Sequence, residues 1–205
     1  ESKRVLLDDS IKIICYKDCS QQRPNVPYFA SFRGNGGDAI VWPFGIDNAV
    51  GLVKSRWIES VDTDFENKQP KVNWSGKAGS SGDMAALKAS EVGSSHDETV
   101  SNDEYSHTTK FFIVSEVSNR KDHIRKMLSH RYLLAEDNSY SILWMLLSQS
   151  VVFMPATRRT ESWLMEGFLQ PFVHFVPIEP DYSDVGEKIT WCESNVGEAK
   201  MISER

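Results

Sequence analysis

The chain has 205 residues, enough for one domain of ordinary size or for two small lobes with a buried core. Its formal net charge of −6 at pH 7 argues against a nucleic-acid-binding protein, because that affinity depends on clusters of cations. The basic residues between Arg120 and Lys126 are expected to lie on a solvated helix face instead.

The cysteines argue against a cysteine metal site and a disulfide framework, and the apolar runs argue against a membrane-spanning segment. Cys15, Cys19 and Cys192 match no metal-ligand spacing, and an odd count does not define a disulfide framework, although one bridge stays open. The longest apolar run, 142–155, is broken by polar residues and falls short of the ~20 residues that span a bilayer. Because the sequence starts at Glu1 and shows no signal peptide, targeting information is expected upstream of it.

In the first half, short strands are followed by polar or small residues. Strands are predicted over 10–16, 39–42 and 71–74. Asp18 follows the first strand, where ligands bind in open α/β sheets, but Asp is also common in turns and a turn role is the default. The loop 75–82 follows the third strand and can present backbone N–H groups to phosphate. It lacks P-loop spacing, so a plain flexible loop is its default role.

The second half alternates helices with apolar strands. A mobile polar loop over 88–109 comes first. Helices are predicted over 120–128, 140–147, 161–169, 184–191 and 197–205, and strands over 111–114, 151–154 and 172–178. This alternation predicts a parallel α/β sheet. The side chains expected in the core include Trp144, Trp163, Phe172 and a hydrogen-bonded His174, while Asp181 and Asp184 are expected to help cap the next helix.

A series of motifs in this half points to a family. Its most specific piece is 169–177, Leu-Gln-Pro-Phe-Val-His-Phe-Val-Pro, which is followed by Asp-Tyr-Ser-Asp-Val at 181–185. The segments 132–134, 143–153, 162–166 and 189–191 complete the series, which resembles the carboxyl-terminal half of glycosyltransferase family 90. That family includes protein O-glucosyltransferases and capsule-associated xylosyltransferases. Upstream, 17–19, 41–43 and 72–79 resemble further family motifs in the family's order.

The resemblance implies an α/β fold with Rossmann-like lobes of the GT-B type, with an incomplete amino-terminal lobe. The expected parts are a partial acceptor-side lobe over 1–87, the mobile loop 88–109 and a nucleotide-sugar-binding lobe over 110–205. The implied reaction is inverting transfer of a glucose- or xylose-class sugar from a UDP-sugar to a hydroxyl group of a protein or glycan, without metal or cofactor. By the same analogy, the protein works in the lumen of the endoplasmic reticulum or Golgi, or at a membrane through a segment absent from this chain.

The resemblance also implies roles for individual residues. Asp18 matches the catalytic base. The implied donor-binding residues are Ser75, Gly76, Lys77, Gly79, Ser141 and Glu166. Glu166 is predicted to hydrogen-bond the donor ribose, with a helix-surface carboxylate as the alternative.

Two other functions stay open. Ser75 stands where the family usually carries Arg, and Ser141 and Leu143 stand where many members carry a basic residue. The chain could therefore be a degenerate member or fragment that keeps the fold without turnover. It could also be a non-enzymatic module that binds a nucleotide or a protein in the same cleft.

Overall fold

The computed structural model describes residues 15–16, 29–30, 32–34, 40–41, 55–74, 112–114, 120–135, 141–157, 160–162 and 164–204. Several predicted features lie outside these ranges: Asp18, Ser75, Gly76, Lys77, Gly79, Trp163 and the loop 88–109. Within the described ranges, no helix is long and apolar enough to cross a membrane.

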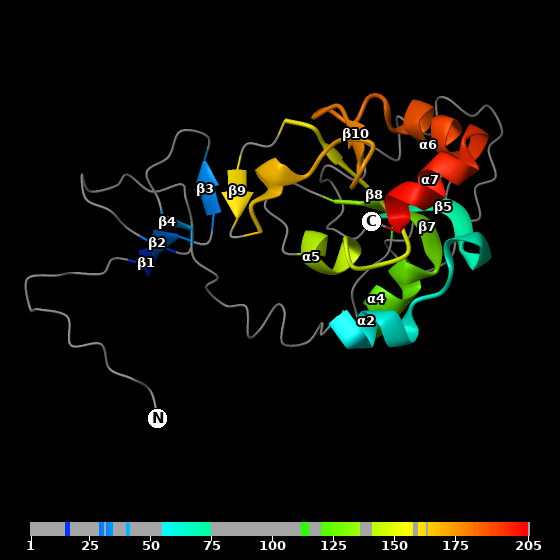
Figure 1. Ribbon diagram of the computed structural model, residues 1–205, viewed down its shortest axis with the longest axis horizontal. Helices are drawn as coiled ribbons and strands as arrows, with labels where there is room; N and C mark the ends of the chain where they lie inside the picture. Colours follow the sequence, from blue (N-terminus) through cyan, green and yellow to red (C-terminus); the bar gives the residue numbers. More distant parts are fainter. Residues whose placement is uncertain are drawn as a thin grey trace, which may run out of the picture.

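A parallel sheet of five strands forms the centre of the described residues (Figure 1). Its strands are β5 (Gln69–Trp74), β6 (Phe112–Val114), β7 (His130–Leu134), β8 (Val151–Pro155) and β10 (Val176–Ile178). Their spatial order is β10-β8-β7-β5-β6, and every neighbouring pair is parallel. The predicted parallel α/β sheet is thus confirmed, while a two-lobed GT-B arrangement stays a prediction.

Helices cover both faces of this sheet. One face carries α2 (Ser55–Val61), α4 (Arg120–Leu128) and α5 (Ser141–Met145). The other carries α6 (Val185–Ser194) and α7 (Val196–Ser203). Two 3-10 turns, η1 (Phe65–Asn67) and η2 (Glu166–Phe168), complete the elements around the sheet. In Figure 1, α2 and α4 lie side by side, and Arg125 of α4 lies 5.5 Å from the ring centre of Trp57 in α2.

The core divides into two clusters because side chains alternate between the faces of a strand. On β8, Val151 and Phe153 pack on the α6–α7 side, and Val152 and Met154 pack on the α2–α4 side. All five residues of β8 are buried, as expected for a strand in the middle of a parallel sheet. The predicted core position of Trp144 is confirmed, with 3% of its surface exposed.

Shorter strands lie to one side of the five-stranded sheet (Figure 1). A parallel sheet contains β1 (Cys15–Tyr16), β2 (Phe29–Ala30) and β4 (Ile40–Val41), in that order. Separately, β3 (Phe32–Gly34) pairs antiparallel with β9 (Thr160–Ser162). An ion pair between Arg33 and Glu161 reinforces this pairing. It joins residues that are 128 positions apart in the chain.

The predicted helix over 161–169 is wrong. Its first two residues, Glu161 and Ser162, belong to the pairing between β9 and β3, and Met165 adopts a left-handed backbone with φ of 54°. The Glu166 carboxylate then accepts hydrogen bonds from Ser162, at 2.8 Å from its backbone N and 2.6 Å from its Oγ. These contacts close a tight turn, and they outweigh the helical spacing of the apolar residues.

The predicted strand over 172–178 and the core position of Phe172 are also wrong in part. Only 176–178 form β10, because the backbone turns at Phe172, whose φ is 58° and whose N donates to the Phe175 oxygen at 2.7 Å. Phe172 is 46% exposed. The Nδ1 of His174 accepts a hydrogen bond from Gln170 N at 2.9 Å, which confirms that this histidine is hydrogen-bonded. Its predicted core position is wrong, because His174 is half-buried and lies in the turn before β10.

The predicted capping of α6 by the Asp184 side chain is wrong. Asp184 occupies the position before the first helical residue, but its side chain makes no capping bond to α6. Its Oδ1 accepts instead from Glu179 N at 2.8 Å, and Asp181 Oδ1 accepts from Ser183 N at 3.0 Å. Both carboxylates therefore stabilise the turn itself.

A buried ion pair lies at the amino ends of the strands. Lys68 Nζ, before β5, donates to the Asp62 carboxylate and to Ser150 Oγ, the latter at 2.8 Å. Ser150 Oγ in turn donates to the His130 oxygen at 2.8 Å. The side chains of Lys68 and Asp62 are 0% and 5% exposed. The pair links the segment after α2 to the starts of three strands.

Two buried histidines, His130 at the start of β7 and His123 in α4, are expected to make the stability of the protein depend on pH. Burial lowers the pKa of the His130 ring below the usual value of 6.5, and the same holds for His123. As pH falls through 6.5, the unfolded chain binds protons that the folded chain does not bind, so stability falls. We expect the free energy of unfolding to decrease between pH 7.5 and pH 5.5, as measured by urea denaturation. Replacing His130 by Gln and His123 by Phe together should flatten this dependence, and an unchanged slope would contradict the assignment.

Candidate active site

The carboxyl ends of the five parallel strands form one edge of the sheet. Trp74 of β5 lies opposite Val114 of β6, and Pro155 of β8 lies opposite Ile178 of β10. Open α/β sheets bind their ligands at this edge, because the loops that leave the strands are free to hold ligand groups. The edge is therefore the candidate site.

Two of the predicted donor-binding elements leave neighbouring strands at this edge. The segment 75–79 begins directly after Trp74, the last residue of β5. Ser141 begins α5, the next described element after β7. Since β5 and β7 are paired, with Asn73 opposite Leu133, the segments that follow these two strands leave from the same part of the edge. The positions of Asp18 and of 75–79 themselves lie outside the described residues.

Ser141 is half-buried at the start of α5. The short helix is anchored by three buried side chains, Ile142, Trp144 and Met145, which belong to the core on the α2–α4 side. This anchoring fixes the direction in which the helix begins. A donor-binding role for Ser141 stays a prediction.

Glu166 is 4% exposed, so the alternative of a helix-surface carboxylate is wrong. One carboxylate oxygen accepts from the Ser162 hydroxyl and the other from the Ser162 backbone N–H. A ribose hydroxyl would have to share an oxygen with these two donors. The donor-binding role therefore stays a prediction, alongside a structural role in the 162–166 turn.

Replacing Glu166 by Ala is expected to destabilise the protein by about 1–3 kcal/mol, because buried donors of Ser162 lose their acceptors. Urea denaturation measures the effect. The matched control is Glu59→Ala, which removes an exposed carboxylate from α2. Equal stability of the two variants would show that the turn does not depend on Glu166.

The described residues offer no other obvious reactive group. Burial raises the pKa of the Cys192 thiol to about 12, so this fully buried cysteine stays protonated and is a poor nucleophile. The buried Tyr132 donates a hydrogen bond from its hydroxyl group to the Glu193 carboxylate, and burial raises the pKa of Tyr132. Among the residues with described positions, no group of three or more His, Cys, Asp or Glu is arranged to hold a metal ion.

A groove of about 410 Å³ lies elsewhere, between α6, α7 and the turn before β10. It is lined by Phe172, Val173, Trp191, Glu198, Met201 and Ile202. Phe172 and Trp191 meet edge to face, with ring centres 5.3 Å apart. The groove lies toward the amino end of β10, since Phe172 and Val173 precede that strand, and none of the predicted site residues lines it.

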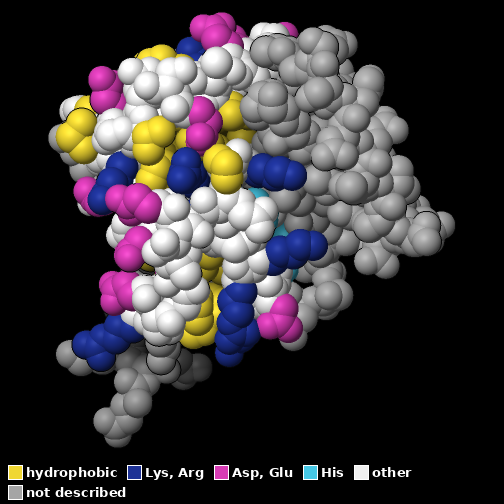
Figure 2. Space-filling model, turned by 90° about the vertical axis from the view of Figure 1, so that its right-hand side faces the viewer, with side chains coloured by type: hydrophobic (Ala, Val, Ile, Leu, Met, Phe, Trp, Pro, Cys, Tyr) yellow, Lys and Arg dark blue, Asp and Glu magenta, His cyan; other side chains and the backbone are white. Residues whose placement is uncertain are grey.

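Charges of both signs are mixed on the face of the described residues that Figure 2 shows. In the view of Figure 2, Lys and Arg side chains alternate with Asp, Glu and apolar side chains over the described residues. They form no continuous basic surface on that face. In α4, Lys121, Arg125 and Lys126 are exposed, which confirms the predicted solvated helix face.

One residue near the candidate edge was missed by sequence reasoning. His123 lies on the buried stripe of α4 with Ile124, Met127 and Leu128. The spacing of four residues between His123 and Met127 was the available signal, because such pairs share a helix face. The histidine was not recognised as buried because the charged residues around it in the sequence lie on the exposed side of the helix.

Comparison with known proteins identifies related sequences. The family model described as Glycosyl transferase family 90 matches residues 51–205. The chain is 37% identical over 82 residues to O-glucosyltransferase LpsA of Dichelobacter nodosus, covering 38% of this chain and 26% of that protein. It is 38% identical over 65 residues to Protein O-glucosyltransferase 2 of Danio rerio, covering 32% of this chain and 13% of that protein.

A third relative, Uncharacterized protein 179R of Invertebrate iridescent virus 6, is 31% identical over 83 residues, covering 37% of this chain and 7% of that protein. The matched segments thus cover about a quarter or less of the length of these three relatives.

Proposed function

The chain belongs to glycosyltransferase family 90, and on this basis we propose that it transfers a glucose- or xylose-class sugar from a UDP-sugar to a hydroxyl group of a protein or glycan. The names of two relatives, an O-glucosyltransferase and a protein O-glucosyltransferase, support both the sugar class and the oxygen acceptor. The family match begins before α2 and includes every strand of the five-stranded sheet.

The observation that carries the proposal is that the predicted donor-binding elements follow two neighbouring strands of the sheet. The segment with Ser75, Gly76, Lys77 and Gly79 leaves β5, and Ser141 follows β7, at neighbouring carboxyl ends of a parallel sheet. Backbone N–H groups of small-residue loops suit phosphate oxygens, and a lysine adds a positive charge. This edge of the sheet therefore offers donors for the diphosphate of a nucleotide sugar.

The proposed reaction is a single displacement at the anomeric carbon. Asp18, two residues after β1, takes the proton of the acceptor hydroxyl as its oxygen forms the new bond to that carbon. The bond between the carbon and the diphosphate breaks on the opposite side, which inverts the configuration and releases UDP. Lys77 and the N–H groups near it stabilise the negative charge that develops on the diphosphate.

Calorimetric titration of the purified protein with UDP, UDP-glucose and UDP-xylose tests this proposal. We expect saturable binding that does not require a divalent metal, with a GDP-sugar as the control that should not bind. Transfer of the sugar to a hydroxyl acceptor is then measured with the donor that binds. If no uridine nucleotide binds, the proposal is wrong.

The second candidate is a family member that has lost turnover and binds a nucleotide or a protein. It is favoured by Ser75 and Leu143, which stand where many family members carry basic residues. Donor binding without transfer to any acceptor would support a nucleotide-binding module. Absence of donor binding would instead favour a degenerate member that keeps the fold or binds a protein.

A further inference from the structure

His123 is a buried histidine without a hydrogen-bond partner. Only 8% of its surface is exposed, and neither Nδ1 nor Nε2 has a partner in the structure. A neutral imidazole carries one donor and one acceptor, and burying both without partners is unfavourable because their hydration is lost. An unpartnered imidazole in the free protein suggests that a bound ligand supplies its missing hydrogen bond.

The topology places His123 near the candidate edge. α4 connects β6 to β7, and β5 lies between these two strands in the sheet, so the helix crosses over β5 (Figure 1). The amino end of α4 follows the carboxyl end of β6, and that end is level with Trp74, the last residue of β5. The first turn of α4 therefore lies at the edge where the donor is proposed to bind.

The direction of the side chain agrees with this placement. The buried stripe of α4 consists of His123, Ile124, Met127 and Leu128, and His123 is the member closest to the amino end. Side chains in an α-helix lean toward its amino end. This general geometry favours an imidazole that leans toward the carboxyl edge of the sheet, whereas Met127 and Leu128 belong to the core on the α2–α4 side.

The amino end of α4 suits an anion. Lys121, in the second helical position, is exposed, and its Nζ lies 6.0 Å from the ring centre of Trp57 in α2. The nearby acid, Asp122, is paired with Arg125 at 2.8 Å. The free N–H groups of a helix amino end favour phosphate.

We propose that His123 donates a hydrogen bond to the diphosphate of the nucleotide-sugar donor, which binds at the amino end of α4. This inference rests on the proposed function, because it assigns a further contact to the same donor. The imidazole N–H and the backbone N–H groups of the first turn supply donors of the kind that a diphosphate requires. His123 thus adds a donor-binding residue that the family motifs did not indicate.

The test compares UDP with uridine, which lacks the diphosphate. Replacing His123 by Phe is expected to weaken UDP binding about tenfold, the effect of losing one hydrogen bond to a charged group, without changing uridine binding. The same variant is expected to raise the midpoint of urea unfolding, since no unpartnered nitrogens remain. His123→Gln, which keeps an N–H donor, should retain part of the UDP affinity. If the Phe variant does not fold, UDP and uridine binding are compared in the Gln variant instead.

Met127→Ala is the matched control, because it loosens the same helix without removing a polar group. It should lower stability and leave the ratio of UDP to uridine affinity unchanged. If the native protein binds UDP and the Phe and Gln variants bind it equally well, the role of His123 is wrong and the proposed function stands. Equal weakening of UDP and uridine would likewise overturn the diphosphate contact. A native protein that binds no UDP overturns both proposals.

Discussion

Replacing Asp18 by Asn is expected to lower the rate of sugar transfer by about 10²- to 10⁴-fold, the usual contribution of a general base. The amide cannot take the proton of the acceptor hydroxyl, but it keeps the size and most of the polarity of the carboxylate. UDP affinity should therefore be unchanged. The measurement is the initial rate of transfer from the UDP-sugar that binds in calorimetry, with UDP affinity determined on the same preparation.

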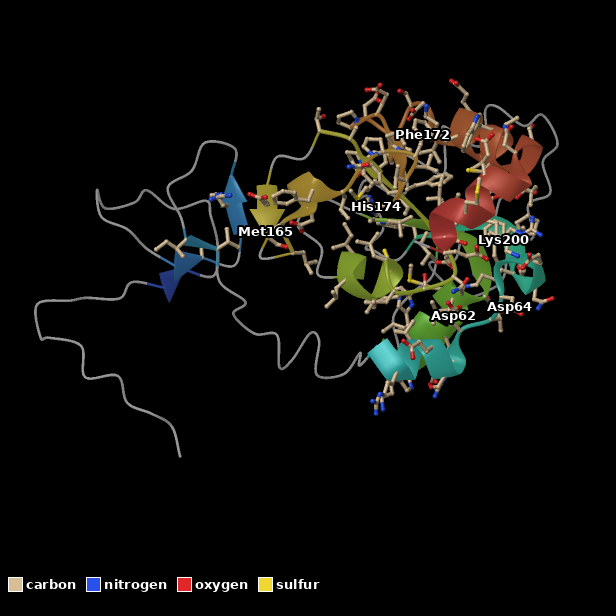
Figure 3. The ribbon with its side chains drawn as sticks, viewed as in Figure 1. Asp62, Asp64, Met165, Phe172, His174 and Lys200 are labelled. Atoms are coloured by element: carbon tan, nitrogen blue, oxygen red, sulfur yellow. The ribbon has the colours of Figure 1, made fainter. Side chains whose placement is uncertain are left out.

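The control for this variant is Asp64→Asn. Asp64 precedes η1, is exposed and makes no side-chain capping bond (Figure 3). Its replacement changes the net charge by the same amount and should leave both rate and affinity intact. If the Asp18 variant transfers sugar at the native rate, Asp18 is not the base.

Replacing Lys68 by Met is expected to destabilise the protein by about 3–5 kcal/mol, because it leaves the Asp62 carboxylate buried without its cation. The loss also removes the hydrogen bond from Lys68 to Ser150, which joins the starts of β5 and β8. Urea denaturation followed by circular dichroism measures the difference. The double variant with Asp62→Asn should recover part of the loss, since the uncompensated charge is then absent.

Lys200→Met is the matched control. Lys200 pairs with Glu66 on the surface, where water screens the interaction, so its loss should have a far smaller effect. Figure 3 labels Lys200 and Asp62, and the two positions differ in exposure rather than in the type of ion pair. Similar stability of the two Lys-to-Met variants would show that the Lys68 pair is not buried in solution.

Sequence periodicity predicted the elements whose apolar pattern coincides with their packing. The helix over 120–128 was predicted with the bounds that α4 has, and the apolar run at 151–154 became β8. The segment 161–169 also has a helical pattern, but its backbone follows the pairing of β9 with β3 and the contact of Glu166 with Ser162. Sequence reasoning could not see the pairing of β9 with β3, because β3 lies more than a hundred positions away. The contact of Glu166 with Ser162 spans four residues, a spacing that also occurs between turns of a helix, so the sequence did not distinguish the two.

The location of the candidate site was predictable from the sequence, but the features that depend on packing were not. Strands followed by small or polar residues indicated the carboxyl edge of a parallel sheet, and the described ends of β5 and β7 agree with that edge. The burial of Lys68 and the unpartnered ring of His123 could not be predicted, because both depend on how helices pack over the sheet. The roles of Asp18 and the residues from Ser75 to Gly79 stay predictions.

The pairing of β3 with β9 has a consequence for how the chain folds during synthesis. Arg33 and Glu161 meet across 128 positions of sequence, and closing so long a loop costs entropy before any contact repays it. On a ribosome, which releases the amino end first, β3 has no partner until residues 160–162 emerge from the exit tunnel. An unpaired strand edge invites association with other chains. Nascent chains should therefore depend most on chaperones during the synthesis of the intervening segment.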